Sequence, residues 1–282
     1  MSPLLQVTGL VKEYRAPHGL FGSRPVRVVD DVDLTVDRGE TLGLVGESGS
    51  GKTTVARCVL GMTAPTAGSI TFDGTDVLSL GRRARAEFRR RVQPVFQDPY
   101  ASLDPRWTIG RSIAESLVAH RIGTPADRER RVRELLGQVG LPASSADRRP
   151  SQLSGGQRQR VGIAAALASG PDLIVADEPV SALDVSVQAQ VLNLFAQLQR
   201  DLGVAILFVS HDMGVVEHIS DRVTVLFHGT VVETAPAAQL FADPQHEYTR
   251  ALLAAVPVPD PVGARIRRAR RAARADPAAL AP

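Results

Sequence analysis

Residues 46–53 of this chain read Gly46-Glu47-Ser48-Gly49-Ser50-Gly51-Lys52-Thr53 and match the pattern G-x-x-x-x-G-K-[ST]. Glycines at this spacing let backbone N–H groups turn inward around phosphate oxygens, and the N-terminus of a following helix adds positive potential. In this pattern the lysine reaches the β- and γ-phosphates, and the hydroxyl of Thr53 ligates Mg²⁺. The alternative is an ordinary glycine turn that binds no phosphate.

The segments around this loop favour phosphate binding, because the pattern requires a strand before it and a helix after it. Thr41–Val45 is rich in strand-forming residues, and Lys52–Met62 has the composition of a helix. Further along, strands and helices alternate, which predicts an α/β fold with a mainly parallel sheet. The predicted elements are a helix over Gln157–Ala168, a strand over Leu173–Ala176, a helix over Val187–Asp201, and strands over Ala205–Ser210 and Val223–Phe227.

Two regions interrupt that alternation. The first forty residues predict short strands joined by turns, at Leu4–Val7, Val26–Val29 and Val32–Val36. Residues from about Thr108 to Gln138 have helical spacing with few strand signals. We therefore expect a helical insert at about residues 98–153.

A buried strand, Leu173–Ala176, runs directly into Asp177 and Glu178. We expect Asp177 to lie near the Mg²⁺ and Glu178 to polarise a water molecule for in-line attack on the γ-phosphate. The alternative is a pair of solvated acids at the end of a strand, and the loop at residues 46–53 counts against it.

Residues 153–160 read Leu153-Ser154-Gly155-Gly156-Gln157-Arg158-Gln159-Arg160. A second Ser-Gly-Gly here opens a helix, which gives the chain a second anion-binding helix N-terminus. Without the other motifs, this stretch could be a simple helix cap with flexible glycines. The octet resembles the signature motif of ATP-binding-cassette (ABC) ATPases.

Four further positions are similar to that family. Gln97 resembles the glutamine that contacts the metal and the attacking water and senses the transporter subunit. Ser181–Asp184 resembles the loop that crosses the dimer interface, and His211 resembles the switch histidine that contacts the γ-phosphate. Tyr14 resembles the aromatic residue that stacks on adenine.

The resemblance implies three sets of site residues. We expect the catalytic residues to be Lys52, Gln97, Glu178 and His211, and the Mg²⁺ ligands to be Thr53, Gln97 and Asp177. The expected nucleotide-binding residues are Tyr14, Gly46, Glu47, Ser48, Gly49, Ser50, Gly51, Lys52, Thr53, Thr54, Ser154, Gly155, Gly156, Gln157 and Asp184.

The resemblance also implies an architecture and an assembly. We expect a P-loop NTPase core with a mainly parallel sheet, an N-terminal antiparallel β subdomain and the inserted helical signature subdomain. In the family two such subunits form a dimer, and each ATP lies between the residue 46–53 loop of one subunit and the Ser154-Gly155-Gly156 of the other.

Longer stretches are similar to the ATPases of oligopeptide and dipeptide importers, namely Val95–Arg106, Asp184–Gln190, His246–Leu253 and Val256–Pro261. This implies a subunit at the cytoplasmic face of the inner membrane that uses ATP and Mg²⁺ to power peptide import. Its implied partners are a second ATPase subunit (the same chain or a different one), two transmembrane permease subunits and, indirectly, an extracytoplasmic solute-binding protein.

The chain departs from those relatives in three ways. Val180 stands where threonine is usual, Glu247 stands where proline is usual, and the cysteine-containing C-terminal extension is absent. The chain contains one cysteine, Cys58, which excludes a disulfide framework, a four-cysteine zinc site and a protein-held iron–sulfur cluster.

The distribution of charge along the chain bears on the class of partner that it binds. The formal net charge of the 282 residues is +3, but residues 257–282 hold six arginines and two aspartates, so the rest of the chain sums to −1. A body this close to neutral argues against a nucleic-acid partner.

We expect residues 1–262 to form the ATPase domain and residues 263–282 to be a basic, disordered tail. No segment approaches the 18 or so consecutive apolar residues of a membrane span, and residues 1–5 do not resemble a secretion signal.

Three alternatives remain at this point. The same ATPase could serve nickel, glutathione or another solute, because this subunit does not contact the cargo. A cassette ATPase acting on nucleic acid or ribosomes usually has two cassettes, a long coiled-coil insert or zinc sites, and none of these features is present here. A nucleotide kinase or GTPase explains neither residues 153–160 nor Gln97.

Overall fold

The computed structural model describes residues 2–18, 22–98 and 103–255. The predictions for the basic tail, for Val256–Pro261 and for residues 99–102 within the Val95–Arg106 stretch lie outside the described residues. Among the described helices, none combines the length and the apolar character needed to cross a lipid bilayer.

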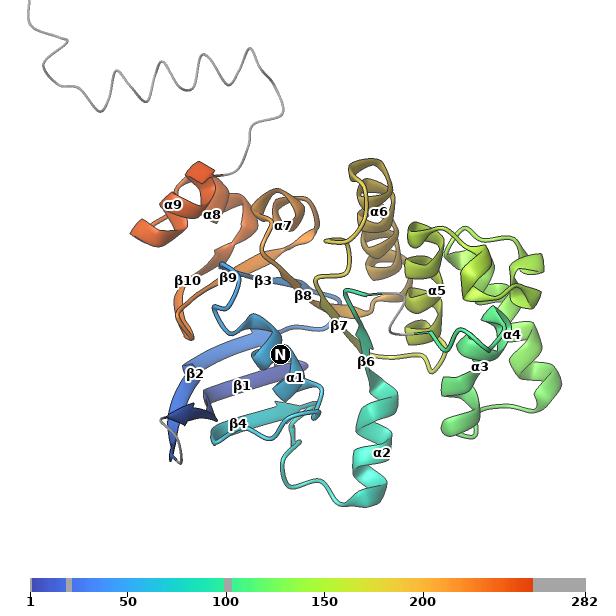
Figure 1. Ribbon diagram of the computed structural model, residues 1–282, viewed down its shortest axis with the longest axis horizontal. Helices are drawn as coiled ribbons and strands as arrows, with labels where there is room; N and C mark the ends of the chain where they lie inside the picture. The colour runs from blue at the N-terminus through green and yellow to red at the C-terminus, as the bar shows by residue number, and fades with distance from the viewer. Residues whose placement is uncertain (1, 19–21, 99–102, 256–282) are drawn as a thin grey trace, which may run out of the picture.

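A six-stranded sheet forms the centre of the molecule, with the strand order β10-β9-β3-β8-β7-β6 (Figure 1). Five of its strands are parallel, and β10 pairs antiparallel with β9 at one edge. The inner strands are continuous apolar runs because both faces of the sheet are covered. The strands are β3 (Thr41–Val45), β6 (Val92–Val95), β7 (Leu173–Asp177), β8 (Ala205–Ser210), β9 (Arg222–Phe227) and β10 (Thr230–Pro236).

A second, antiparallel sheet lies beside the first, with the order β2-β1-β4-β5. Its strands are β1 (Leu5–His18), β2 (Gly22–Val36), β4 (Ala67–Phe72) and β5 (Thr75–Asp76). The two strands expected at Val26–Val29 and Val32–Val36 are one strand. Asp31 has a φ of 53°, and the pairing with β1 shifts register there, which breaks the sequence pattern without breaking the strand.

Helices cover both faces of the central sheet, and two apolar cores lie between the layers. The helix that follows the glycine loop, α1 (Lys52–Val59), is shorter than the expected Lys52–Met62, because Gly61 takes a φ of 64° and ends it. The other helices outside the insert are α2 (Arg82–Arg91), α6 (Val185–Leu202), α7 (Met213–Ile219), α8 (Ala237–Ala242) and α9 (Glu247–Ala255).

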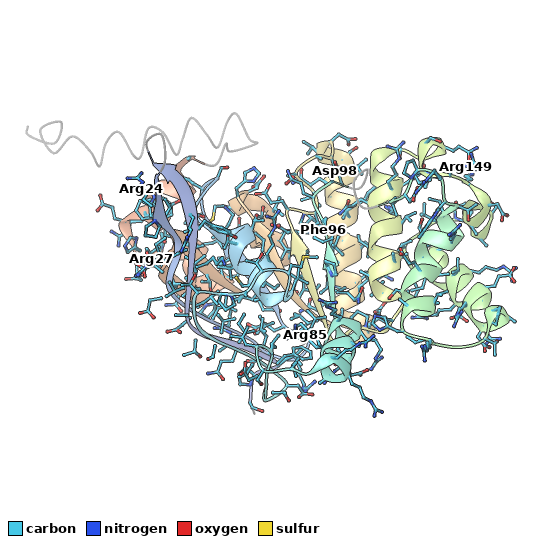
Figure 2. All side chains as sticks on the ribbon, turned by 60° about the horizontal axis from the view of Figure 1, so that its bottom comes forward. Arg24, Arg27, Arg85, Phe96, Asp98 and Arg149 are labelled. Carbon is cyan, nitrogen blue, oxygen red and sulfur yellow. The ribbon has the colours of Figure 1, made fainter. Side chains whose placement is uncertain are left out.

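The helical insert forms a lobe on the far side of the molecule from the antiparallel sheet (Figures 1 and 2). It contains α3 (Ile109–Ala119), α4 (Pro125–Gln138) and two short 3-10 turns, and α5 (Gly155–Leu167) follows. The helical stretch expected over Thr108–Gln138 is two helices. Gly123 has a φ of 63°, and Thr124 then caps α4 in a reciprocal pair with Asp127.

Candidate active site

The loop between β3 and α1 has a shape that only glycine allows at two of its positions. A Cβ atom at Gly46 would lie 2.1 Å from the carbonyl oxygen of Leu226, and one at Gly51 would lie 2.7 Å from that of Val28. Gly49 and Gly51 also have positive φ angles of 82° and 105°. The loop therefore fits closely against β9, which contains Leu226, and against β2, which contains Val28.

Lys52 begins α1, and its side chain is buried. Its ammonium donates hydrogen bonds to the carbonyl oxygens of Gly46 and Glu47, each at 2.7 Å. Burial lowers the pKa of Lys52, and the nearby carboxylates of Glu178, Asp177 and Glu47 oppose that effect. The ammonium thus lies inside the glycine loop.

Asp177 ends β7 at the same edge of the sheet at which β3 ends and α1 begins. The hydroxyl of Thr53 donates to Asp177 Oδ1 at 3.1 Å. Burial raises the pKa of Asp177, and the hydrogen bond from Thr53 opposes that rise. A hydroxyl and a carboxylate side by side are hard oxygen ligands, so this pair fits Mg²⁺.

Glu178 and His211 follow the adjacent parallel strands β7 and β8. His211 Nδ1 lies 3.1 Å from Glu178 Oε1. Glu178 has a φ of 50°, which is rare for a residue with a side chain, and its N–H donates to the Val209 carbonyl at 2.9 Å. Strained backbone of this kind is concentrated at functional sites. Val180 is buried in the apolar core, and its effect on Glu178 stays a prediction.

A cavity of about 340 Å³ brings the glycine loop, Gln97 and Glu178 together. Three segments that are far apart in the sequence meet here. Val28 of β2 also lines the cavity, and no sequence motif pointed to it. The lining residues are Val28, Ser48, Gly49, Gly51, Lys52, Thr53, Thr54, Gln97 and Glu178.

Ser154, Gly155, Gly156, Gln157 and Asp184 do not line this cavity. Ser154 caps α5 in a reciprocal pair with Gln157, and Asp184 caps α6. The two caps lie together, since a Cβ atom at Gly156 would come within 2.2 Å of Val187. These residues form a second cluster of helix N-termini, separate from the phosphate loop of the same chain.

Neither Tyr14 nor Tyr248 lines this cavity. Tyr14 on β1 is 40% exposed and does not line the cavity; the Lys12 ammonium lies 5.1 Å from the centre of its ring. Its contact with adenine stays a prediction. Tyr248 was not predicted to reach the loop, yet its hydroxyl accepts a hydrogen bond from the backbone N–H of Glu47 at 3.1 Å. Only its place in the His246–Leu253 stretch marked it in the sequence.

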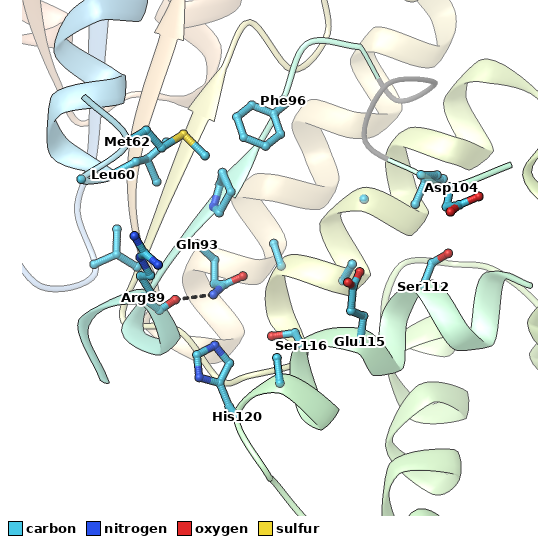
Figure 3. Close-up of a pocket in the computed structure, with 18 of the residues that line it drawn as sticks. Leu60, Met62, Arg89, Gln93, Phe96, Asp104, Ser112, Glu115, Ser116 and His120 are labelled. Carbon is cyan, nitrogen blue, oxygen red and sulfur yellow. Dashed lines mark hydrogen bonds between the residues drawn. The ribbon is translucent and has the colours of Figure 1, made fainter. Parts of the chain in front are cut away.

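A larger cavity of about 720 Å³ separates β6 from α3. Figure 3 shows Ser112, Glu115, Ser116 and His120 along α3 on one side, with Met62 and Phe96 across from them. Phe96 is 38% exposed and lines this cavity, and the next residue, Gln97, lines the cavity at the glycine loop.

Comparison with known proteins identifies the family. The ABC transporter family profile matches residues 29–181, and the profile described as "Oligopeptide/dipeptide transporter, C-terminal region" matches residues 232–280. The second match reaches past residue 262, where the resemblance noted above ends.

Three relatives have informative names. A Brucella ovis protein named "Putative peptide import ATP-binding protein" is 55% identical over 92% of this chain and 80% of its own. The oligopeptide transport ATP-binding protein OppF of Bacillus subtilis is 48% identical over 92% of this chain and 84% of its own. The glutathione import ATP-binding protein GsiA of Pectobacterium atrosepticum is 51% identical over 92% of this chain, which spans 42% of that protein.

A solved structure agrees with the fold. The dimeric post-hydrolysis structure of the ATP-binding cassette MJ0796, bound to ADP and Pi, has a TM-score of 0.74 at 29% identity, covering 83% of this chain and 98% of that one. The chain therefore belongs to the ATPases of the ABC transporter family, and it carries the C-terminal region of the oligopeptide and dipeptide transporters.

Proposed function

We propose that this chain is the ATP-hydrolysing subunit of an importer of di- or oligopeptides. The observation that carries the proposal is the 340 Å³ cavity that unites Lys52, Thr53, Gln97 and Glu178. The peptide-transport relatives and the match over residues 232–280 support the choice of cargo.

Each residue of the site has a role that follows from its chemistry. The backbone N–H groups of residues 49–54 surround the phosphates, and the Lys52 ammonium leaves the loop carbonyls for the β- and γ-phosphates. Thr53, Asp177 and Gln97 would hold Mg²⁺, which would neutralise charge on the phosphate oxygens. Glu178 polarises the attacking water. His211, whose Nδ1 lies 3.1 Å from Glu178 Oε1, contacts the γ-phosphate.

The active unit is a dimer of cassettes, with the Ser154-Gly155-Gly156 cluster of each subunit completing the ATP site of the other. Two observations support this: the cluster does not line the chain's own nucleotide cavity, and the similar MJ0796 structure is dimeric with ADP and Pi. The second subunit is either a copy of this chain or a different cassette ATPase.

The permease docks in the 720 Å³ cavity between β6 and α3. Phe96 lines this cavity and its sequence neighbour Gln97 lines the nucleotide cavity, so a permease segment that contacts Phe96 acts one residue away from Gln97. The docked chain is then held at the cytoplasmic face of the membrane, and the solute-binding protein acts on it only through the permease.

Uptake by the host tests the cargo. Deletion of the gene should abolish uptake of di- or oligopeptides, and the wild-type gene but not the Glu178→Gln variant should restore it. Glutathione is the main competing cargo, because its importer's ATPase is 51% identical to this chain. Loss of glutathione or nickel uptake with unchanged peptide uptake would contradict the proposal.

A further inference from the structure

The C-terminal helix α9 contacts the phosphate loop through one side chain. Tyr248 lies in the first turn of α9, and its hydroxyl accepts the hydrogen bond from the Glu47 N–H at 3.1 Å. Its ring packs against that of Phe227 at the end of β9, with 4.0 Å between the ring centres and a tilt of 36° between the planes. The contact with Phe227 thus positions the phenol ring, and the phenol oxygen makes the hydrogen bond to the loop.

Both backbone polar groups of Glu47 are hydrogen-bonded. Its carbonyl oxygen accepts from the Lys52 ammonium at 2.7 Å and from the Ser50 N–H at 3.1 Å, while its own N–H donates to Tyr248. When Lys52 turns toward phosphate, the carbonyl loses the ammonium. The bond to Tyr248 is made by a backbone N–H of the loop and not by the Lys52 side chain, so it does not have to break when the ammonium moves.

The start of α9 is itself anchored to the sheet. The Glu233 carboxylate on β10 accepts hydrogen bonds from the backbone N–H groups of Gln245 and His246, at 2.8 and 3.0 Å. The adjacent β9–β10 turn also supports the loop directly, because the Gly229 N–H donates to the Ser50 carbonyl at 3.0 Å. The Tyr248 hydroxyl therefore acts from a fixed position.

The protonation state of the Tyr248 hydroxyl also matters for the hydrogen bond to the loop. Burial raises the pKa of Tyr248, and the hydrogen bond from Glu47 opposes that rise, so the hydroxyl is neutral at physiological pH. Glu247 is an acidic residue in the first turn of α9, where negative charge stabilises a helix.

We propose that Tyr248 is a positioning residue for nucleotide binding, whose hydroxyl holds the phosphate loop in its binding-competent shape and so joins the C-terminal region to the nucleotide site. The inference rests on the proposed nucleotide site at residues 46–54. It differs from a packing role, in which the ring alone would matter.

The Tyr248→Phe variant separates the two roles, because it keeps the ring on Phe227 and removes only the hydroxyl. Calorimetric titration of the full chain with ADP and with ATP should give a dissociation constant about 3- to 10-fold above that of the wild type, the range expected for one lost hydrogen bond. The binding stoichiometry should not change, since a partly unfolded sample would lower the stoichiometry and leave the dissociation constant unaltered.

Thr230→Val is the matched control. Thr230 is exposed at the start of β10, directly after the β9–β10 turn, and its hydroxyl donates to the Phe227 carbonyl at 2.9 Å and not to the loop. The nucleotide affinity of the Thr230→Val variant should equal that of the wild type. Wild-type affinity in Tyr248→Phe, or a fall in stoichiometry alone, would overturn the positioning role. Failure of the wild-type chain to bind nucleotide would instead overturn the proposed nucleotide site.

Discussion

Lys52 is one of two lysines in a chain that otherwise uses arginine for its basic residues. Its ammonium fits between two loop carbonyls at 2.7 Å, a space that suits a compact point charge and not a planar guanidinium. We expect Lys52→Arg to weaken ATP binding at least about tenfold and to lower hydrolysis about 100-fold or more. Equilibrium binding and steady-state hydrolysis measure the two effects.

The other lysine provides the control for that substitution. Lys12 lies on β1, and its ammonium donates to the Ala64 carbonyl in the connection between α1 and β4, outside the cavity. Lys12→Arg should therefore bind and hydrolyse ATP as the wild type does. Equal losses in both variants would show that the effect of Lys52→Arg is not specific to the phosphate loop.

Asp177 makes the stability of the protein depend on pH. Burial raises its pKa above that of the unfolded chain, so the protonated acid favours folding, and this contribution is lost as the pH rises through the raised pKa. Asp177→Asn keeps an oxygen acceptor for Thr53 and has no charge to bury. Without nucleotide, its melting temperature should exceed that of the wild type at neutral pH, and the difference should shrink on acidification. A difference that grows at low pH would contradict this account.

At the scale of elements, the junction of α5 with α6 allows no side chain at Gly156. A Cβ atom there would approach Val187 to 2.2 Å, so Gly156→Ala must displace one helix N-terminus from the other. Overpacking of this kind costs about 1–3 kcal/mol of unfolding free energy. Chemical denaturation should show that loss, and a second substitution, Val187→Ala, should recover part of it.

Gly162 in the same helix is the matched control, because a Cβ atom there would have no neighbour within 4 Å. Alanine is favoured over glycine inside a helix by about 0.5–1 kcal/mol. Gly162→Ala should be neutral or stabilising. Destabilisation of the same size as in Gly156→Ala would mean that α5 as a whole, and not its junction with α6, is sensitive to an added methyl group.

Elements with strong local patterns could be predicted from the sequence, and the others could not. The strand at Thr41–Val45, the glycine loop and the strand at Ala205–Ser210 were confirmed. The short elements β10, α7, α8 and α9 were missed, because each is too brief or too mixed to show a period. Val28 and Tyr248 reach the site only through tertiary packing, which leaves no spacing signal in the chain.

At the scale of the whole molecule, the described fold ends with α9 at Ala255, after the contact from Tyr248 to the loop. We expect deletion of residues 265–282, which removes all six tail arginines, to change the rate of ATP hydrolysis less than twofold. Steady-state assays of the truncated and full-length chains make the comparison. A large loss would assign those residues a structural role.

The assembly should depend on ATP. In the Glu178→Gln variant, ATP should hold two cassettes together, because hydrolysis no longer lets them separate. Light scattering should report a mass of two cassettes with ATP and of one with ADP, either for this chain alone or for its mixture with a partner ATPase. A mass that is independent of the nucleotide would contradict the shared site at Ser154–Gly156.

Turnover by Glu178→Gln in the assembled transporter tests the central claim most directly. The substitution removes the carboxylate charge that polarises the attacking water and leaves Lys52, Thr53 and the loop unchanged. The account predicts an unchanged dissociation constant for ATP and a hydrolysis rate lower by about 100-fold or more. Hydrolysis at the wild-type rate would contradict it.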